Sequence, residues 1–459
     1  MNTLIIISVL PIVLLYLGLY KAQKALLPVT VIGLLVALGL AISQWNNGAQ
    51  PIFHDMMLFD NYSIAFCAIT ITTTILILLL SKGYFEKISN HIAEYYSIIL
   101  FSLAGIVVMV SYYNLVMLFI GIEIMSVSLY ILAGIKKNDF ASNEAALKYF
   151  LMGAFSTGFL LFGIALIYGS AGSFHLEAIR DYVIANPRTI DPMFYVGIML
   201  IIVGLCFKVG AAPFHFWTPD VYEGSPTLIT AFMSTAVKTA GFAAFLRLFT
   251  ECFQPLSSFW MPALLVITIL TLFIGNITAL YQQSFKRMMA FSSISHAGYL
   301  LFAIVALGAS SANAVFVYAT AYSIASIIAF AALILVRQQS GSDNFESFNG
   351  LAKKNPFLAF TLTIAMLSLA GIPLTAGFIG KFFMFSSALS QYQVWLVILA
   401  VINAIISIFY YFRVIVAMYF RSAETEELII PTYYKFVLGL SALVTIIIGI
   451  YPTFITGLI

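Results

Sequence analysis

Apolar runs of about 20 residues recur along nearly the whole chain, separated by short polar or Pro/Gly-rich turns. A helix needs about 20 apolar residues to cross a hydrocarbon core about 30 Å thick. The pattern therefore predicts an all-α polytopic membrane protein with about 14 transmembrane helices. The expected spans are residues 3–20, 26–44, 62–81, 95–111, 114–135, 143–169, 192–214, 225–249, 259–281, 285–307, 312–336, 357–387, 393–420 and 433–455.

Composition supports the same class. Of the 459 residues, 62% are hydrophobic and only 8% are charged, whereas soluble domains carry about 25% charged residues. The net charge of +3 and the absence of a Lys/Arg run argue against a nucleic-acid partner. Cys67, Cys206 and Cys252 lie far apart, so they predict no metal site, iron–sulfur cluster or disulfide framework.

The distribution of Lys and Arg predicts the orientation. The first apolar run is not preceded by a basic segment, so it is expected to be a retained span rather than a cleaved signal. With the N-terminus outside, thirteen Lys and Arg residues fall at inner loops and helix ends, against three outside: Arg180, Arg188 and Arg247. The positive-inside rule therefore predicts both termini on the outer side.

Two segments between the spans stand out. Residues 173–186 place Leu176, Ile179 and Val183 on one helical face, which predicts a short helix lying at the outer surface. Residues 338–355 read as a polar inner connection rather than a domain. We therefore expect one transmembrane domain over residues 1–459.

Helices 7 and 12 predict an internal repeat. The seventh contains Lys208, Gly210 and Pro213, and the twelfth contains Gly371 and Pro373, followed by a lysine. Because they are five spans apart, they run in opposite directions, as in an inverted repeat of helices 4–8 and 9–13. The predicted limits are 1–94 for three N-terminal helices, 95–250 and 258–420 for the repeats, and 421–459 for the C-terminal helix.

Broken helices at matching positions of inverted repeats are typical of ion sites. Ordinary proline kinks are the alternative, and the lysine near each break argues against them.

Charged residues inside predicted spans carry the candidate chemistry. A charge at mid-bilayer costs about 2.5–3.5 kcal/mol, so each of these residues needs a reason to be there. Lysine can lose its proton when desolvated, whereas arginine effectively cannot. The pattern predicts a proton path, with static structural cations as the alternative. The residues are Glu123, Lys148, Lys208, Lys238 and Lys381.

Glu123 lies near the middle of helix 5, where an unpaired carboxylate would be protonated. It therefore has a cationic partner or stores a proton, and Lys148 is the candidate partner. Glu144 and Lys148 are spaced i, i+4, the favourable order for a helical ion pair. An interfacial salt bridge is the alternative for Glu144.

Lys208 and Lys238 lie in neighbouring spans, and small and hydroxylated residues surround Lys238 in the sequence. Burial and like-charge repulsion favour the neutral amine, whereas a nearby carboxylate favours the charged one. His296 lies between the lysine clusters in chain order and is a candidate relay, although a hydrogen-bonded core histidine is as plausible. Lys381 is expected near an exit to the outside, and Arg413 is expected to be structural.

Three segments resemble a known family, the antiporter-like subunits of respiratory complex I. They are Ala146–Phe155, Phe207–Thr227 and Lys286–Tyr299. The resemblance implies fourteen helices in two inverted repeats and proton translocation driven by quinone reduction elsewhere in the complex. By position, it assigns the family's helix-5 glutamate and its lysines of helices 7, 8 and 12 to Glu123, Lys208, Lys238 and Lys381.

The resemblance also implies partners and cofactors. Subunit M of the family has glutamate at the position of Lys381, and subunit L carries a long lateral helix, so neither branch is expected. The partners would be subunit M and small membrane subunits such as K and J, in a bacterial inner membrane. FMN, iron–sulfur clusters and quinone would belong to partner subunits, and no cofactor is expected in this chain.

Two rival functions remain open. A multi-subunit cation/proton antiporter shares the fold, and an assembly scaffold with silent charges would need no proton path. A haem- or quinone-reducing membrane subunit is disfavoured, because paired intramembrane histidines are missing from the sequence.

Overall fold

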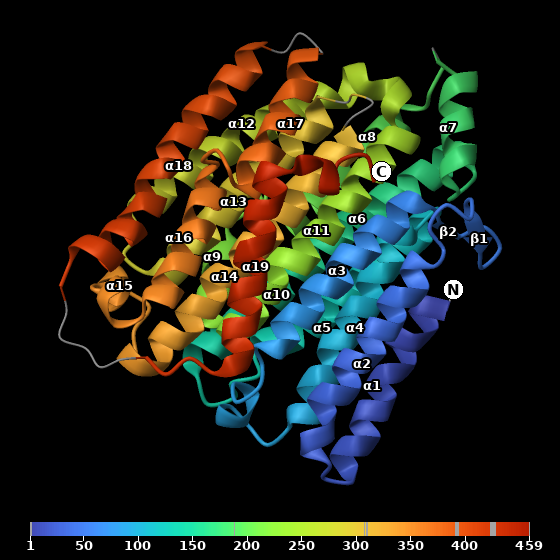
Figure 1. Cartoon of the computed structure of the whole chain (residues 1–459). Coiled ribbons are helices and arrows are strands. Elements are labelled where there is room, and N and C mark those ends of the chain that lie inside the picture. Colours follow the sequence, from blue (N-terminus) through green and yellow to red (C-terminus); the bar gives the residue numbers. More distant parts are fainter. Residues whose placement is uncertain are drawn as a thin grey trace.

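The computed structural model describes residues 2–187, 189–306, 308, 311–390, 394–422 and 428–458. Arg188 and the expected limits at residues 307, 393 and 459 lie outside them. Figure 1 shows a helical bundle, with the N-terminal helices on one side and the helices of the second half on the other. The N-terminus, the C-terminus and α7 lie toward the same end of the bundle in this view.

Among the described residues, thirteen helices are long and apolar enough to cross a membrane. Two shorter apolar helices, α16 (Pro356–Ala370) and α17 (Ala376–Ser390), take the position predicted for helix 12, so together with the thirteen they give the fourteen predicted crossings. The long helices are α1 (Asn2–Leu19), α2 (Gln23–Ile42), α3 (Asn61–Leu79), α4 (Ile92–Ser111), α5 (Leu115–Ala133), α6 (Phe140–Ala171), α8 (Pro192–Val209), α10–α11 (Thr227–Glu251), α12 (Ser257–Leu280), α13 (Phe285–Val305), α14 (Ser311–Ser340), α18 (Val394–Phe420) and α19 (Thr432–Ile450).

The elements between the spans are short. Helix α7 (Leu176–Ala185) buries Leu176, Ile179 and Val183, as the sequence predicts. A hairpin of β1 (Gln50–Ile52) and β2 (Met57–Phe59) follows α2, and the sequence analysis missed it. The predicted inner connection begins inside α14 and contains two short helices, Phe345–Phe348 and α15 (Leu351–Lys354).

The predicted helix breaks are confirmed. Helix α8 ends at Gly210, whose φ of 73° is left-handed, and α9 (Trp217–Gly224) starts after a turn that contains Pro213. Helix α16 (Pro356–Ala370) ends at Gly371, with φ 83°, and α17 (Ala376–Ser390) starts after a turn that contains Pro373. A glycine at this position avoids the steric cost that a Cβ would bring.

Close helix contacts in the membrane depend on small residues, because apolar surface alone does not draw helices together in lipid. Helices α4 and α5 meet at Gly105 and Gly121: a Cβ built on Gly105 would lie 2.8 Å from the Gly121 oxygen. Helices α12 and α13 meet in the same way at Gly275, where a Cβ would lie 2.5 Å from the Ser295 nitrogen. Both pairs of helices therefore pack backbone to backbone.

One irregularity in helix geometry was not predicted. Residues Met233–Val237 form a π-helical turn between α10 (Thr227–Phe232) and α11 (Lys238–Glu251). Such turns occur mostly as single insertions inside α-helices, frequently at functional sites. This turn ends directly before Lys238, one of the predicted site residues.

Candidate functional site

Lys208 lies in the last turn of α8 and is 8% exposed. Its Nζ donates to the Ser126 hydroxyl of α5 at 2.5 Å. That hydroxyl in turn donates to the Ile122 carbonyl of its own helix. The amine also faces the Tyr149 ring, 5.9 Å from the centroid. At the end of α8, the buried amine of Lys208 therefore contacts a neutral oxygen, the Ser126 hydroxyl.

Glu123 lies on α5 three residues before Ser126, on the same face of the helix. Because Lys208 donates to the Ser126 hydroxyl, Glu123 lies one helical turn from that contact. Its Oε1 is buried, and among the described residues it has no hydrogen-bond partner. The carboxylate and the amine are therefore neighbours without a direct ion pair.

The predicted pairing of Lys148 with Glu123 is wrong. Lys148 pairs with Glu144 at 2.8 Å and with Asp220 at 2.7 Å, and its side chain is 40% exposed. The reason is that α6 begins at Phe140, which places Lys148 near the end of the bundle, beside α9. The i, i+4 pair of Glu144 with Lys148 is present, as its spacing indicates.

Lys238 is 3% exposed at the start of α11. Its Nζ donates to the Ser293 carbonyl of α13 at 2.6 Å and contacts the Ser293 hydroxyl at 3.1 Å. Inside the neighbouring π-helical turn, the Ser234 hydroxyl lies 2.5 Å from the Tyr322 hydroxyl. The second lysine is also held by neutral oxygens.

His296 is 2% exposed, with both ring nitrogens engaged. Nδ1 lies 2.6 Å from the Tyr318 hydroxyl and Nε2 lies 2.9 Å from the Tyr411 hydroxyl. A neutral imidazole donates from one nitrogen and accepts at the other, so one tyrosine donates to the ring while the other accepts from it. Ser293, which accepts a hydrogen bond from Lys238, and Tyr299, whose ring faces the Lys381 amine, each lie three residues from His296 on α13, so the histidine lies between the two lysine contacts along this helix.

Lys381 is 4% exposed in α17 and reaches back across the helix break. Its Nζ donates to the Ala370 carbonyl at 2.9 Å and to the Leu369 carbonyl at 3.2 Å. These oxygens belong to the last turn of α16, the negative end of the helix dipole. The amine also lies 4.7 Å from the Tyr299 ring centroid.

Lys286 belongs to this set, although sequence reasoning placed it among the charges at helix ends. It is fully buried, and its Nζ donates to the carbonyls of Ser225 at 2.5 Å and Glu223 at 2.9 Å. Local sequence offers no sign of this, because Lys286 starts α13 and the end of α9 covers it only in the folded chain. The sequence signal for Lys286 was its position in Lys286–Tyr299, one of the three segments that resemble the family.

The buried Arg247 and the half-buried Arg287 pair with carboxylates, whereas the buried lysines do not. Arg247, which the sequence analysis counted at the outer end of its helix, is 4% exposed and contacts both carboxylate oxygens of Asp60, at 2.6 and 2.8 Å. Arg287 pairs with Asp220 and Glu223. Within the part of the chain that the structure describes, Lys208, Lys238, Lys286 and Lys381 form no salt bridge. Arg413, as expected, has a structural contact with the Gln282 carbonyl at 2.8 Å.

Among the described residues, no group of three or more His, Cys, Asp or Glu side chains is placed to hold a metal ion. The candidate site described above consists of amines, hydroxyls, main-chain carbonyls, one imidazole and one carboxylate.

Known proteins resemble this chain over nearly its full length. Residues 112–407 match the family described as the transmembrane part of NADH:quinone oxidoreductase/Mrp antiporter. NADH-quinone oxidoreductase subunit N of Cytophaga hutchinsonii is 41% identical and aligns over 98% of both chains. The same subunit of Flavobacterium psychrophilum is 41% identical over the whole of both chains.

Solved structures agree with these relatives. A chain of respiratory complex I from Thermus thermophilus is 32% identical, with a TM-score of 0.84 over 98% of this chain and 97% of that one. A chain of the Mrp complex from Dietzia has a TM-score of 0.88 over 98% of this chain and 94% of that one, but is only 18% identical, so it shows the fold alone. The predicted resemblance to antiporter-like subunits of complex I is confirmed, and the chain belongs to the NADH-quinone oxidoreductase subunit N family.

Proposed function

We propose that this chain is the proton-translocating membrane subunit of an NADH–quinone oxidoreductase. Electron transfer on partner subunits would supply the energy, and protons would pass along Lys208, Lys238, His296 and Lys381. Moving one proton against 100 mV costs about 2.3 kcal/mol, which a membrane subunit without redox centres must draw from the rest of the complex.

The observation that carries the proposal is the pairing of buried lysines with neutral oxygens. Lys208 donates to a serine hydroxyl, and Lys238 and Lys381 donate to carbonyls. A neutral amine still donates to such an oxygen, so losing a proton does not break the contact. A carboxylate partner would hold the proton on the amine, and Arg247, whose charge is permanent, has such a partner in Asp60.

Helix α13 supports a lateral route between two of these lysines. Ser293, His296 and Tyr299 are three residues apart, so they share one helix face over about 9 Å. Ser293 accepts the bond from Lys238, and Tyr299 lies under the amine of Lys381. His296 sits between them with a tyrosine hydroxyl at each nitrogen, an arrangement suited to passing a proton.

The connection from Lys208 to Lys238 lies where α8 meets α11. A Cβ on Gly241, three residues after Lys238, would lie 3.1 Å from a methyl carbon of Val209, the residue after Lys208. Glu123 supplies the modulating charge, because a carboxylate favours the ammonium form of Lys208 and its neutralisation favours proton release.

We further propose a direction of proton transport and a set of neighbouring subunits. Protons enter from the cytoplasmic side toward Lys208 and Lys238 and leave outside beyond Lys381, with both termini on the outer side of a bacterial inner membrane. The inverted repeats span 95–250 and 258–420. Subunit M and small subunits such as K and J are the neighbours, and FMN, iron–sulfur clusters and quinone belong to partner subunits.

A cation/proton antiporter subunit is the second candidate, because the Mrp complex shares the fold. The 41% identity to subunit N relatives favours the oxidoreductase. Affinity purification of the native assembly through this chain separates the two. Recovery of iron–sulfur subunits with NADH:quinone activity is expected, and their consistent absence from an intact, antiport-active assembly would overturn the proposal.

A further inference from the structure

A basic cavity lies at the end of the bundle where α5 and α14 finish. Its volume is about 220 Å³, and none of Lys208, Lys238, Lys286 and Lys381 lines it. Three of its side chains are cations and none of its eight lining residues is acidic. The residues used below are Tyr84, Lys87, Lys136, Thr227 and Arg337.

The positive charge of this cavity is not balanced. Lys87 and Arg337 have no carboxylate within salt-bridge distance among the described residues, and Lys136 reaches Asp139 only at 4.0 Å. Burial, and then the like charge of Arg337, lower the pKa of Lys136 against the opposing effect of Asp139. Lys136 and Arg337 therefore repel one another, and an anion between them would relieve this.

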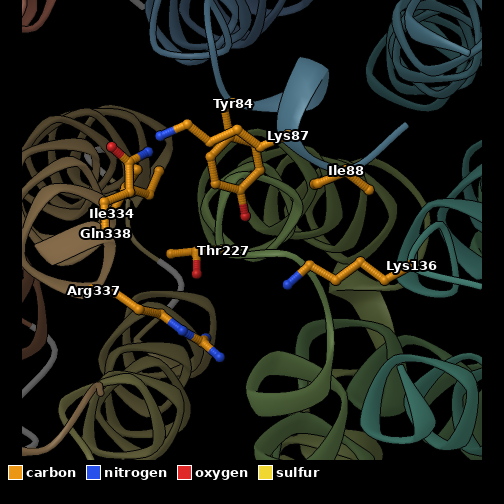
Figure 2. Close-up of a pocket in the computed structure, with 8 residues that line it drawn as sticks. All are labelled: Tyr84, Lys87, Ile88, Lys136, Thr227, Ile334, Arg337 and Gln338. Carbon is orange, nitrogen blue, oxygen red and sulfur yellow. The ribbon is translucent and has the colours of Figure 1, made fainter. Parts of the chain in front are cut away.

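The groups around the opening suit an oxyanion. Figure 2 shows the charged ends of Lys136 and Arg337 and the hydroxyls of Tyr84 and Thr227 turned toward the same space, from four different segments. Tyr84 lies against the main chain of Thr227 and Leu228, at the N-terminus of the 25-residue helical span Thr227–Glu251. Arginine and lysine beside hydroxyls are the donors that proteins use for phosphate groups.

We propose that this cavity binds a phosphate group, and that the group belongs to an anionic membrane lipid. The cavity lies at helix ends, which is the level of lipid headgroups, and Ile88 and Ile334 give it an apolar side. An adjoining cavity of about 510 Å³ shares Lys87 and Lys136 and adds Lys137, His91 and one acidic residue, Asp139, which leaves room for the rest of a headgroup. Basic pockets between helices on the cytoplasmic side are typical sites for such lipids.

Photolabelling of the intact complex tests this site. The complex is placed in phosphatidylcholine nanodiscs with a trace of photoactivatable phosphatidylglycerol, and labelled peptides are identified by mass spectrometry. Label is expected on residues 84–88 and 334–338. The variant Lys136→Gln/Arg337→Gln removes two cations and should lower the yield of label at these peptides by about tenfold or more. Each cation near an anionic surface changes the binding constant by about a factor of five.

The matched control is Lys353→Gln/Lys435→Gln, two exposed cations elsewhere, which should leave the label unchanged. Lys136→Arg/Arg337→Lys keeps the charges and should retain the label, so a folding defect is separated from a lost contact. Excess phosphatidylglycerol should compete, whereas excess inorganic phosphate should not.

Competition by inorganic phosphate at the same peptides would overturn the lipid assignment and favour a soluble phosphate. Three results would overturn the site itself. Phosphatidylcholine could compete as well as phosphatidylglycerol, or the double glutamine variant could leave the label unchanged. The third is the absence of both label and phosphate binding.

Discussion

The amine of Lys238 and the main-chain oxygen of Ser293 are 2.6 Å apart, and this contact joins α11 to α13. Because Ser293 is three residues before His296, the same contact brings Lys238 to the polar face of α13. The proposed path thus runs from one half of the chain into the other through side chains that need no net charge to stay bonded.

Replacing Lys208 by alanine removes the first amine of the proposed row. We expect the complex to assemble, because Lys208 has no salt bridge whose loss would strand a buried partner among the described residues. The contribution of this subunit to pumping should disappear, measured as protons moved per electron in proteoliposomes. Lys435→Ala, an exposed lysine, is the control. An unchanged stoichiometry in the Lys208 variant would refute the role.

Tyr318 and Tyr411 should act as positioning residues for His296, because each contacts one ring nitrogen. Replacing either by phenylalanine removes its hydrogen bond to the ring, worth about 1 kcal/mol, so proton transfer should slow by roughly fivefold. Tyr411→Phe also removes the contact with the Ser292 hydroxyl. The measurement is the rate of proton pumping and its solvent deuterium isotope effect. A merely structural role would lower the amount of assembled complex and leave the rate per complex and the isotope effect unchanged.

Gly371 should not tolerate a side chain. Its φ is 83°, and a Cβ would lie 2.8 Å from Cδ of Lys381. Gly371→Ala should therefore destabilise the complex by about 1–3 kcal/mol and displace the Lys381 amine. Thermal unfolding and pumping report the two effects. Gly39→Ala in α2 is the control, since nothing lies within 4 Å of a Cβ there; equal behaviour of the two variants would contradict the interpretation.

The Asp60–Arg247 pair should make stability depend on pH in acid. Burial would raise the pKa of Asp60, but Arg247 and the hydrogen bonds from Ser63 outweigh burial and hold it below its ordinary value. The stabilisation is therefore present above about pH 4 and is lost as pH falls through the lowered pKa.

Asp60→Asn should cost about 3–5 kcal/mol near neutral pH, because it leaves the buried Arg247 charge unpaired. The difference in free energy of unfolding between wild type and Asp60→Asn should shrink below about pH 4. Thermal unfolding in detergent across pH measures this difference. A difference that stays constant down to the lowest accessible pH would contradict the assignment.

Much of the fold was predictable because spans and breaks are local properties. Long apolar runs predict helices in lipid, and the Gly and Pro residues of helices 7 and 12 predict the breaks that the structure contains at Gly210 and Gly371. The hairpin of β1 and β2 was not predictable in this way, because three-residue strands leave almost no alternating pattern.

The burial of the candidate amines was predictable where a charge lies in mid-span, as for Lys208, Lys238 and Lys381. It was not predictable where burial depends on distant segments. Lys286 starts its helix and reads as an end charge, yet the last residues of α9 enclose it. Lys148 reads as an intramembrane charge, yet Asp220 pairs with it at the end of the bundle. The π-helical turn before Lys238 was also not predictable, since its sequence contains no helix breaker.

The most direct test follows the protonation of the buried amines during turnover. The chain is labelled with ¹⁵N at lysine Nζ, and solid-state nuclear magnetic resonance is recorded on the intact complex in membranes, trapped in oxidised and reduced states. Comparison with Lys238→Arg assigns the signal of that amine. The account predicts a neutral amine signal for Lys238 in at least one trapped state; an ammonium signal in every state would contradict it.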